Sequence, residues 1–185
     1  DKPVIDSHVD GFKKVVELFR LFDQTAGDPL KEYGFVSAED DARINMLRLV
    51  CTYGADEAST ALTELNHIKR SDEARGAPRF ITIYNDLIEA EALTSLNKRG
   101  KAQELIESLI DEATLMERDD LVGEAMMLRA KCHLRSAKNA SEFDSGLAEI
   151  RETVSYFATI GNDAKVGSLQ TVLRRAEGVR LARFG

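Results

Sequence analysis

The sequence predicts an all-α protein, and three observations carry that prediction. Apolar residues recur at spacings of three and four along nearly the whole chain, which is the period of an amphipathic helix. Only three of the 185 residues are proline, and residues with high helix propensity predominate. No segment alternates apolar and polar residues over the length of a strand, so we expect no sheet. The apolar stripes and the breaks between them define about eight helices.

The first expected helix spans residues 7–24 and is followed by a loop over 26–36 that contains Pro29. The apolar face of this helix is rich in phenylalanine and needs a surface to cover it. We therefore expect residues 1–36 to form an N-terminal capping helix and loop. Residues 37–185 are then expected to form a single array of helical hairpins.

Seven further helices are expected within that array, separated by short breaks. Ser37 with the acidic residues that follow it favours a helix start, Pro78 suits a first helical turn, and Ser141 is the expected cap of the seventh helix. The expected helices are 37–53, 56–70, 78–96, 101–117, 121–136, a helix from Ser141 through Phe157, and 164–183.

A short apolar motif recurs along the chain. The segment MLRLVC at 46–51 returns as MLRAKC at 127–132 and in part as VLRRA at 172–176. The first two copies are 81 residues apart, which corresponds to two units of about 40 residues. An intermediate copy is expected near residue 87, where LIE stands at 87–89. The repeat predicts hairpins that stack on one another, because one amphipathic hairpin cannot bury its own apolar side.

Two of the expected turns resemble those of the tetratricopeptide-like (TPR-like) superfamily of helical hairpin repeats. The segment YGADEA at 53–58 looks like that family's turn, in which a glycine closes the first helix and an alanine of the second packs against it; RGKA at 99–102 looks like another instance. The resemblance covers residues 38–183. The longer repeat is most similar to variants found in bacterial multidomain regulators. This resemblance implies a right-handed α-solenoid with a concave, partner-binding groove.

The third place of the repeated motif supplies the candidate site. It is occupied by Arg48, Arg129 and Arg174, with Glu89 in the intermediate copy, and His133 follows one helical turn after Arg129. Stacked repeats would place these side chains above one another at helix spacings of about 10 Å. One interpretation is a ladder of interhelical ion pairs. The other is a groove in which arginines grip the carboxylates of an acidic peptide or a small anion.

Motifs for catalysis or for a cofactor are missing from the sequence. The three histidines, His8, His67 and His133, are far apart, and there is no glycine-rich phosphate loop, nucleophile elbow or paired-cysteine metal spacing. We therefore expect no catalytic residue, no metal and no cofactor. The net charge of −7 disfavours nucleic acid as a partner, and no apolar stretch is long enough to span a membrane.

Compartment and context also suggest a class of function. Cys51 and Cys132 lie in expected helices without forming a disulfide framework, which suits the reducing cytoplasm. The sequence has neither an initiator methionine nor a signal-peptide pattern, so we expect a segment of a larger regulatory protein. The expected function is a non-enzymatic scaffold that binds a peptide or protein, either an acidic partner or a second copy of the chain. The alternative is a ligand-sensing domain that controls an attached signalling or transcription-output domain.

Overall fold

The computed structural model describes residues 14, 17 and 58–185 of the chain. Six α-helices occupy the continuous described part, which contains no strand. They belong to two compact units, which divide between Leu96 and Asn97 and are described separately below. The first two expected helices, 7–24 and 37–53, and the expected cap over 1–36 lie outside the described residues. The six described helices correspond to the third through eighth helices expected from the sequence.

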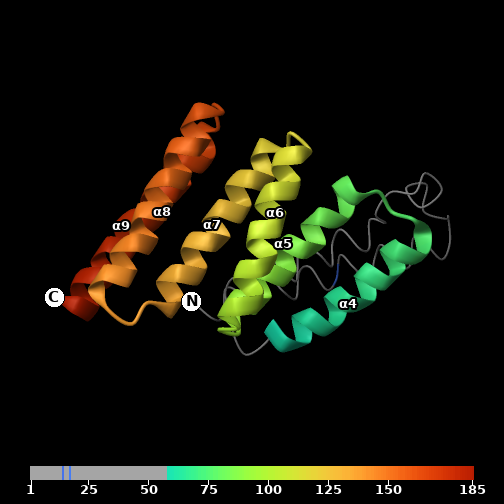
Figure 1. Ribbon diagram of the computed structural model, residues 1–185, viewed down its shortest axis with the longest axis horizontal. Coiled ribbons are helices and arrows are strands. Elements are labelled where there is room, and N and C mark those ends of the chain that lie inside the picture. The colour runs from blue at the N-terminus through green and yellow to red at the C-terminus, as the bar shows by residue number, and fades with distance from the viewer. Residues whose placement is uncertain (1–13, 15–16, 18–57) are drawn as a thin grey trace. The chain divides into compact units, whose positions relative to one another are not determined.

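The described part of the first unit is a pair of antiparallel helices, α4 (Ala58–Arg75) and α5 (Arg79–Ser95), shown in Figure 1. Helix α4 continues five residues beyond its expected end at residue 70, and Gly76 stops it with a positive φ of 66°. The core between the two helices consists of small and aliphatic side chains: Ala58, Ala61, Leu65, Ile68, Ile88 and Ala92.

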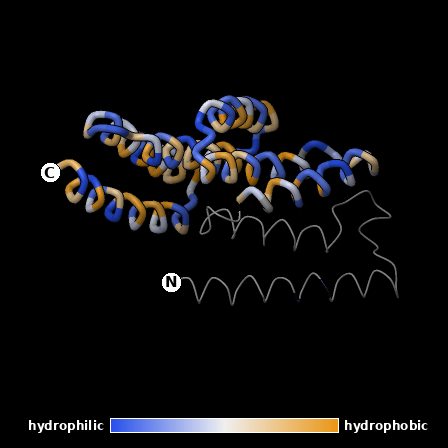
Figure 2. The backbone as a smooth tube through the Cα atoms, turned by 90° about the horizontal axis from the view of Figure 1, so that it is seen from below, coloured by the Kyte–Doolittle hydropathy of each residue, from blue (hydrophilic) through white to orange (hydrophobic). Residues whose placement is uncertain are grey.

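The second unit contains α6 (Arg99–Leu115), α7 (Asp119–Ser136), α8 (Ala140–Thr159) and α9 (Asp163–Phe184). Each helix packs against the next one in the sequence, as Figure 1 shows. Hydrophobic residues recur at intervals along these helices (Figure 2), as the expected amphipathic pattern requires. The prediction of an all-α chain built from sequential antiparallel helices is thus confirmed for the described residues.

Apolar side chains of α7, α8 and α9 pack together in the core of the second unit, and α6 adds four buried apolar residues, Ala102, Ile106, Leu109 and Ala113. Leu128, the second residue of the repeated motif at 127–132, is only 6 % exposed, and Cys132 is buried on the same helix. Leu173, the matching position of the last repeat copy, is half-buried at the edge of the core. Two apolar clusters lie in the second unit. The buried members of the first are Met127, Ala130, Ile150, Phe157 and Leu169, and those of the second are Ala137, Phe143 and Leu147.

Two glycines allow α7 and α8 to approach closely. A Cβ atom added at Gly123 would lie 2.3 Å from Cζ of Phe157, whose ring fills that space. A Cβ atom at Gly146 would lie 2.8 Å from Cγ of Leu134. Both distances are far below normal van der Waals contact, so these positions require glycine because of packing.

Four of the five turns between described helices place one residue in the left-handed region. These residues are Gly76 (φ 66°), Asn97 (φ 55°), Glu117 (φ 54°) and Gly161 (φ 73°). After α6, the amide of Arg118 donates to the carbonyl of Ala113 at 2.9 Å; after α8, the amide of Asn162 donates to the carbonyl of Phe157 at 2.9 Å. Each of these two hydrogen bonds closes a Schellman motif, which satisfies the last carbonyls of the preceding helix.

The turn between α7 and α8 is built differently, and it corrects one sequence prediction. Helix α8 begins at Ala140, and its N-cap is Asn139, whose Oδ1 accepts a hydrogen bond from the amide of Glu142 at 2.9 Å. The carboxylate of Glu142 in turn accepts from the amide of Lys138 at 2.8 Å. The prediction that Ser141 caps this helix was therefore wrong. Asn139 and Glu142 bond reciprocally, because Nδ2 of Asn139 also donates to the Glu142 carboxylate at 2.8 Å, and these bonds fix the start of the helix before Ser141.

None of the described helices is both long and apolar enough to cross a membrane.

Candidate functional site

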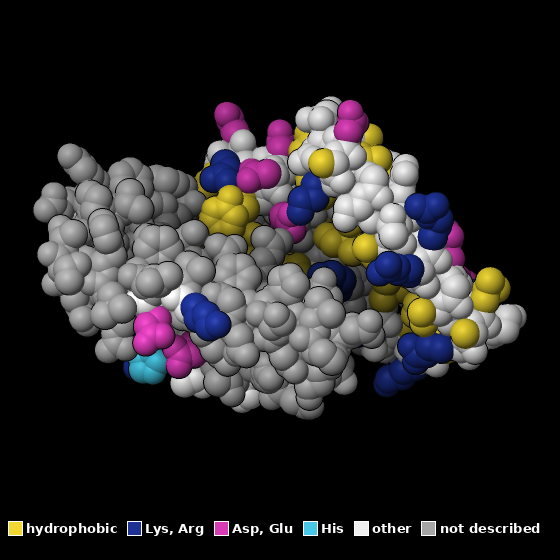
Figure 3. Space-filling model, turned by 180° about the vertical axis from the view of Figure 1, so that it is seen from behind, with side chains coloured by type: hydrophobic (Ala, Val, Ile, Leu, Met, Phe, Trp, Pro, Cys, Tyr) yellow, Lys and Arg dark blue, Asp and Glu magenta, His cyan; other side chains and the backbone are white. Residues whose placement is uncertain are grey.

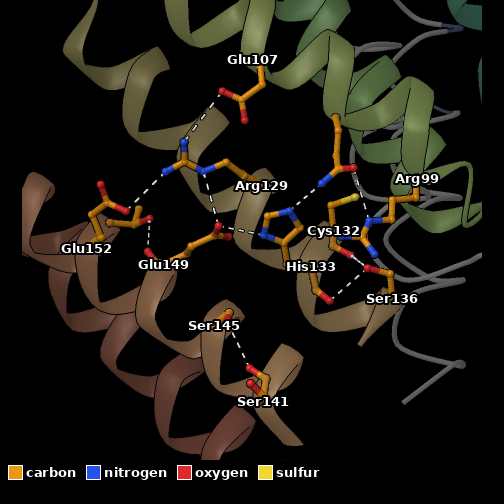
Figure 4. Close-up of polar contacts among 12 residues, drawn as sticks. Arg99, Glu107, Arg129, Cys132, His133, Ser136, Ser141, Ser145, Glu149 and Glu152 are labelled. Carbon is orange, nitrogen blue, oxygen red and sulfur yellow. Dashed lines mark hydrogen bonds and ion pairs between the residues drawn. The ribbon is translucent and has the colours of Figure 1, made fainter. Parts of the chain in front are cut away.

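Arg129, near the middle of α7, lies among three glutamates from the two neighbouring helices (Figure 4). Its Nη1 is 3.9 Å from Glu107 Oε2 on α6, and its Nη2 is 3.4 Å from Glu152 Oε2 on α8. Its Nε is 3.9 Å from Glu149 Oε1, also on α8. Only 22 % of the Arg129 side chain is exposed. The guanidinium charge is thus balanced mainly by carboxylates of the same chain.

His133 lies one helical turn after Arg129 and joins the same group. Its Nδ1 is 2.8 Å from Glu149 Oε1, and its Nε2 is 2.6 Å from the amide nitrogen of Gln103 on α6. Because an amide nitrogen only donates, His133 Nε2 is the acceptor and its Nδ1 proton is donated to Glu149. Gln103 Oε1 accepts from Arg99 Nε at 3.3 Å. A directional chain of hydrogen bonds therefore crosses three helices.

We call this group the α6–α8 polar network. Two of its atoms, Arg129 Nε and Glu149 Oε2, are buried and make no hydrogen bond. A buried polar atom without a partner costs free energy, so these two atoms are the incompletely satisfied part of the network. The network consists of Arg99, Gln103 and Glu107 on α6, Arg129 and His133 on α7, and Glu149 and Glu152 on α8.

The structure brings together two of the five residues predicted as partner-binding. Arg129 and His133 meet through their shared contact with Glu149. Arg174 lies exposed on α9, and it donates from Nε to the carbonyl of Gln170 and from Nη2 to Oγ1 of Thr171, each at 3.4 Å. Both acceptors belong to its own helix, so Arg174 takes no part in the polar network.

The other two predicted residues are Glu89 and Arg48. Glu89 lies on α5 in the first unit, where it pairs with Lys69 of α4, and Arg48 lies outside the described residues. Lys69 also pairs with Asp86, which lies 2.6 Å from Nη2 of Arg79. Burial opposes the charged form of Lys69, but the bonds and charges of its two carboxylate partners outweigh that effect and raise its pKa. The predicted ion-pair ladder through Arg48, Glu89 and Arg129 stays a prediction.

Sequence reasoning missed the residues that hold Arg129 and His133 in place. Glu149 and Glu152 are spaced by three residues, so they share one face of α8, just as Arg129 and His133 share one face of α7. That spacing is visible in the sequence. The pairing also depends on the register between two helices, and a single sequence does not give that register.

A second charged surface lies on α9, away from the network. Arg174, Arg175 and Arg183 are exposed and have no carboxylate partner among the described residues. Val179 and Leu181 on the same helix are 47 % and 65 % exposed. Figure 3 shows basic and hydrophobic side chains gathered at the right of the view, on the side where the C-terminal helix lies.

The described residues hold no group of three or more His, Cys, Asp or Glu side chains arranged to bind a metal ion. No protein-family model, no curated protein and no solved structure matches this chain. What the structure establishes is the architecture of residues 58–185, which are all-helical and whose helices pack in sequential antiparallel pairs.

Proposed function

We propose that this chain is a non-enzymatic interaction scaffold, a TPR-like repeat segment of a larger regulatory protein that binds a peptide or protein partner. The observation that carries the proposal is the packing of α6 through α9, in which each helix contacts chiefly the next one along the chain. Repeat proteins build their core in this way, and they leave extended faces for partners. The shared turn geometry supports the same architecture. A right-handed stack with a concave groove is part of this proposal.

The partner is proposed to be acidic. Of the five groove residues predicted from sequence, Arg174 has an exposed guanidinium that no carboxylate among the described residues neutralises. Arginine can hold a carboxylate through two parallel hydrogen bonds. Arg129 and His133 are instead held by Glu149, and their proposed role is to fix the groove-forming helices against one another. Arg48 and Glu89 remain in the proposed groove set.

A peptide selection on the intact chain tests this function. Peptides from a random displayed library are selected against the immobilised protein, and their affinities are then measured in solution. We expect the selected peptides to be rich in Asp and Glu, and we expect Arg174→Ala to raise Kd at least about fivefold. Arg135→Ala, which removes an exposed arginine of α7, is the matched control and should leave Kd unchanged. Peptides that bind Arg174→Ala as tightly as the unaltered chain would refute the proposal.

A ligand-sensing role is the second candidate, and one observation favours it. Arg129 Nε and Glu149 Oε2 are buried without hydrogen-bond partners inside a network that joins three helices. A small anion that bonded to Arg129 would compete with its glutamates and alter how these helices are held. In a thermal-shift screen of formate, acetate, phosphate and sulfate, this role predicts a raised Tm that Arg129→Ala abolishes and Arg135→Ala retains. Equal Tm values with every anion would rule out sensing of small anions.

A further inference from the structure

The exposed side of α9 has the composition of a binding surface. Arg174, Arg175 and Arg183 lie on it without a carboxylate partner among the described residues, and Val179 and Leu181 add exposed apolar area. The other described cations of α9 are already paired, as Arg180 is with Asp144 at 3.0 Å. Uncompensated cations beside exposed apolar residues give this side of the helix the charge and the apolar area that an acidic partner would complement.

The middle of this exposed side is flat. Gly167, Thr171, Gly178 and Ala182 are exposed, and their spacings of four, seven and four residues place them along one side of the helix. A Cβ atom at either glycine would meet no heavy atom within 4 Å. The arginines lie on both sides of this strip. Another helix can therefore come close to α9 and meet cationic groups along its length.

Helix α6 of the same unit offers the opposite charge. Glu104, Glu107 and Asp111 are exposed and spaced by three and four residues, so they share one face. Glu104 and Asp111 have no ion-pair partner among the described residues, and Glu107 approaches Arg129 only to 3.9 Å. Leu115 at the end of this face is 86 % exposed, the largest exposure among the large hydrophobic residues described.

We propose that the basic side of α9 in one copy packs on the acidic face of α6 in a second copy. Arg174 and Arg175, which flank the strip, then meet the carboxylates of α6, and Leu181 finds an apolar neighbour in Leu115. This inference rests on the proposed scaffold function, because it names the partner that α9 binds. The two faces differ, so the contact is head-to-tail, and each added copy leaves a fresh α6 face and a fresh α9 side.

Charge reversal tests this contact. The first variant carries Arg174→Glu and Arg175→Glu, and the second carries Glu104→Arg and Asp111→Arg. Each alone presents like charges on both surfaces, so self-association should weaken at least about tenfold. An equimolar mixture restores opposite charges across the contact and should associate again. Arg135→Glu with Lys138→Glu alters two exposed cations elsewhere by the same net charge, and this matched control should associate like the unaltered chain.

Sedimentation velocity over a range of protein concentrations provides the measurement, and circular dichroism confirms that every variant is folded. The unaltered chain should sediment faster as its concentration rises at about 50 mM salt, and it should return to the monomer at about 0.5 M salt, where the charges are screened. A monomer at all concentrations in low salt would overturn the inference. So would a mixture of variants that fails to associate, or variants that associate as the unaltered chain does.

The failure of this contact is distinguishable from a failure of the scaffold function. A chain that stays monomeric yet binds acidic peptides through Arg174 would retain the scaffold function and lose only the inferred second copy. A monomeric chain that binds no peptide in an Arg174-dependent manner would overturn both.

Discussion

Gly123 shows how one residue decides the contact between two helices. It lies in the interior of α7, where glycine is intrinsically less favourable than alanine by about 1 kcal/mol. The ring of Phe157, which is 2 % exposed, occupies the space of the missing side chain. The packing of the aromatic ring therefore outweighs the local preference of the helix.

Gly123→Ala should destabilise the chain by about 1–3 kcal/mol, because the added methyl group forces the buried Phe157 ring to move. Gly167→Ala is the matched control on α9. Nothing lies within 4 Å of its added methyl group, so alanine should stabilise the helix by about 1 kcal/mol. Unfolding in guanidinium chloride, which also screens charged contacts between copies, gives both values. A neutral or stabilising Gly123→Ala would contradict the close packing of α7 on α8.

Tyr156 provides a prediction for alkaline pH. Burial, followed by the hydrogen bond that its hydroxyl donates to Asp119 at 2.9 Å, raises the pKa of Tyr156 to about 12 from an ordinary value of 10.0. The folded state thus favours the neutral phenol. The stabilisation is fully present below the unfolded pKa, and it is lost as the pH rises from about 10 through about 12.

Tyrosinate absorbance measures this titration directly. One of the four tyrosines should ionise near pH 12, and Tyr156→Phe should remove that step. Asp119→Asn should move the step toward the ordinary value without reaching it, since burial remains. A titration curve that Tyr156→Phe changes only near pH 10 would contradict the partly buried, hydrogen-bonded phenol.

For single residues, the sequence predicts which apolar side chains are buried better than it predicts which polar side chains are in contact. Leu128 could be assigned to the core, because Ala125 and Cys132 lie on the same side of the helix and the position recurs as an apolar residue in the other copies of the motif. The contacts of Arg129 could not be predicted in the same way. Its three glutamates belong to other helices, and Glu149 is 20 residues away along the chain. Periodicity within one helix carries no information about which polar residue lies opposite on the next.

The turns between the helices resemble one another more in backbone conformation than in amino-acid sequence. Gly76 and Gly161 could be predicted as helix ends, since glycine adopts the left-handed conformation without strain. Asn97 is a weaker indication, and Glu117 gives none, yet both adopt the same φ. Glu117 lies in the short turn between α6 and α7. The amides of Glu117 and Arg118 donate to carbonyls of the last turn of α6, and these bonds hold Glu117 in a conformation that glutamate does not favour.

Glu117→Gly should therefore stabilise the chain by about 1 kcal/mol, as it removes the strain of a side chain at positive φ. Asn97→Gly should have a smaller effect, because asparagine tolerates this conformation. Gly161→Ala, the reverse change in an equivalent turn, should cost about 1 kcal/mol. Thermal or chemical unfolding of the three variants orders these values. A destabilising Glu117→Gly would mean that its side chain makes a contact worth more than the strain.

On the scale of the whole chain, the described helices form two compact units that divide after Leu96. The sequence predicts one array over residues 37–185, and this remains a prediction, since the first part of that range lies outside the described residues. Two apolar clusters of the second unit join α7, α8 and α9, and α6 adds four buried apolar residues to the same unit. The repeat period of the sequence does not reveal such a division, because it identifies similar helices but not how tightly neighbouring helices pack against one another.

A fragment of residues 97–185 should accordingly fold without the rest of the chain. Two of its apolar clusters and the α6–α8 polar network lie within this fragment. We expect a helical circular dichroism spectrum and a single cooperative thermal transition. Residues 1–185 serve as the reference. A fragment that is unfolded, or that melts without cooperativity, would show that the second unit depends on the first and would favour one continuous array.

The helices of the second unit are joined in two different ways. The Schellman bonds after α6 and α8 hold those two turns through the backbone itself. No such ring closes between α7 and α8, where Ala137 and Asn139 are extended. The alignment of these two helices depends instead on side chains, namely the Phe157 ring against Gly123 and the bond between His133 and Glu149. At this junction side-chain packing thus takes the role that backbone hydrogen bonds have in the other two turns.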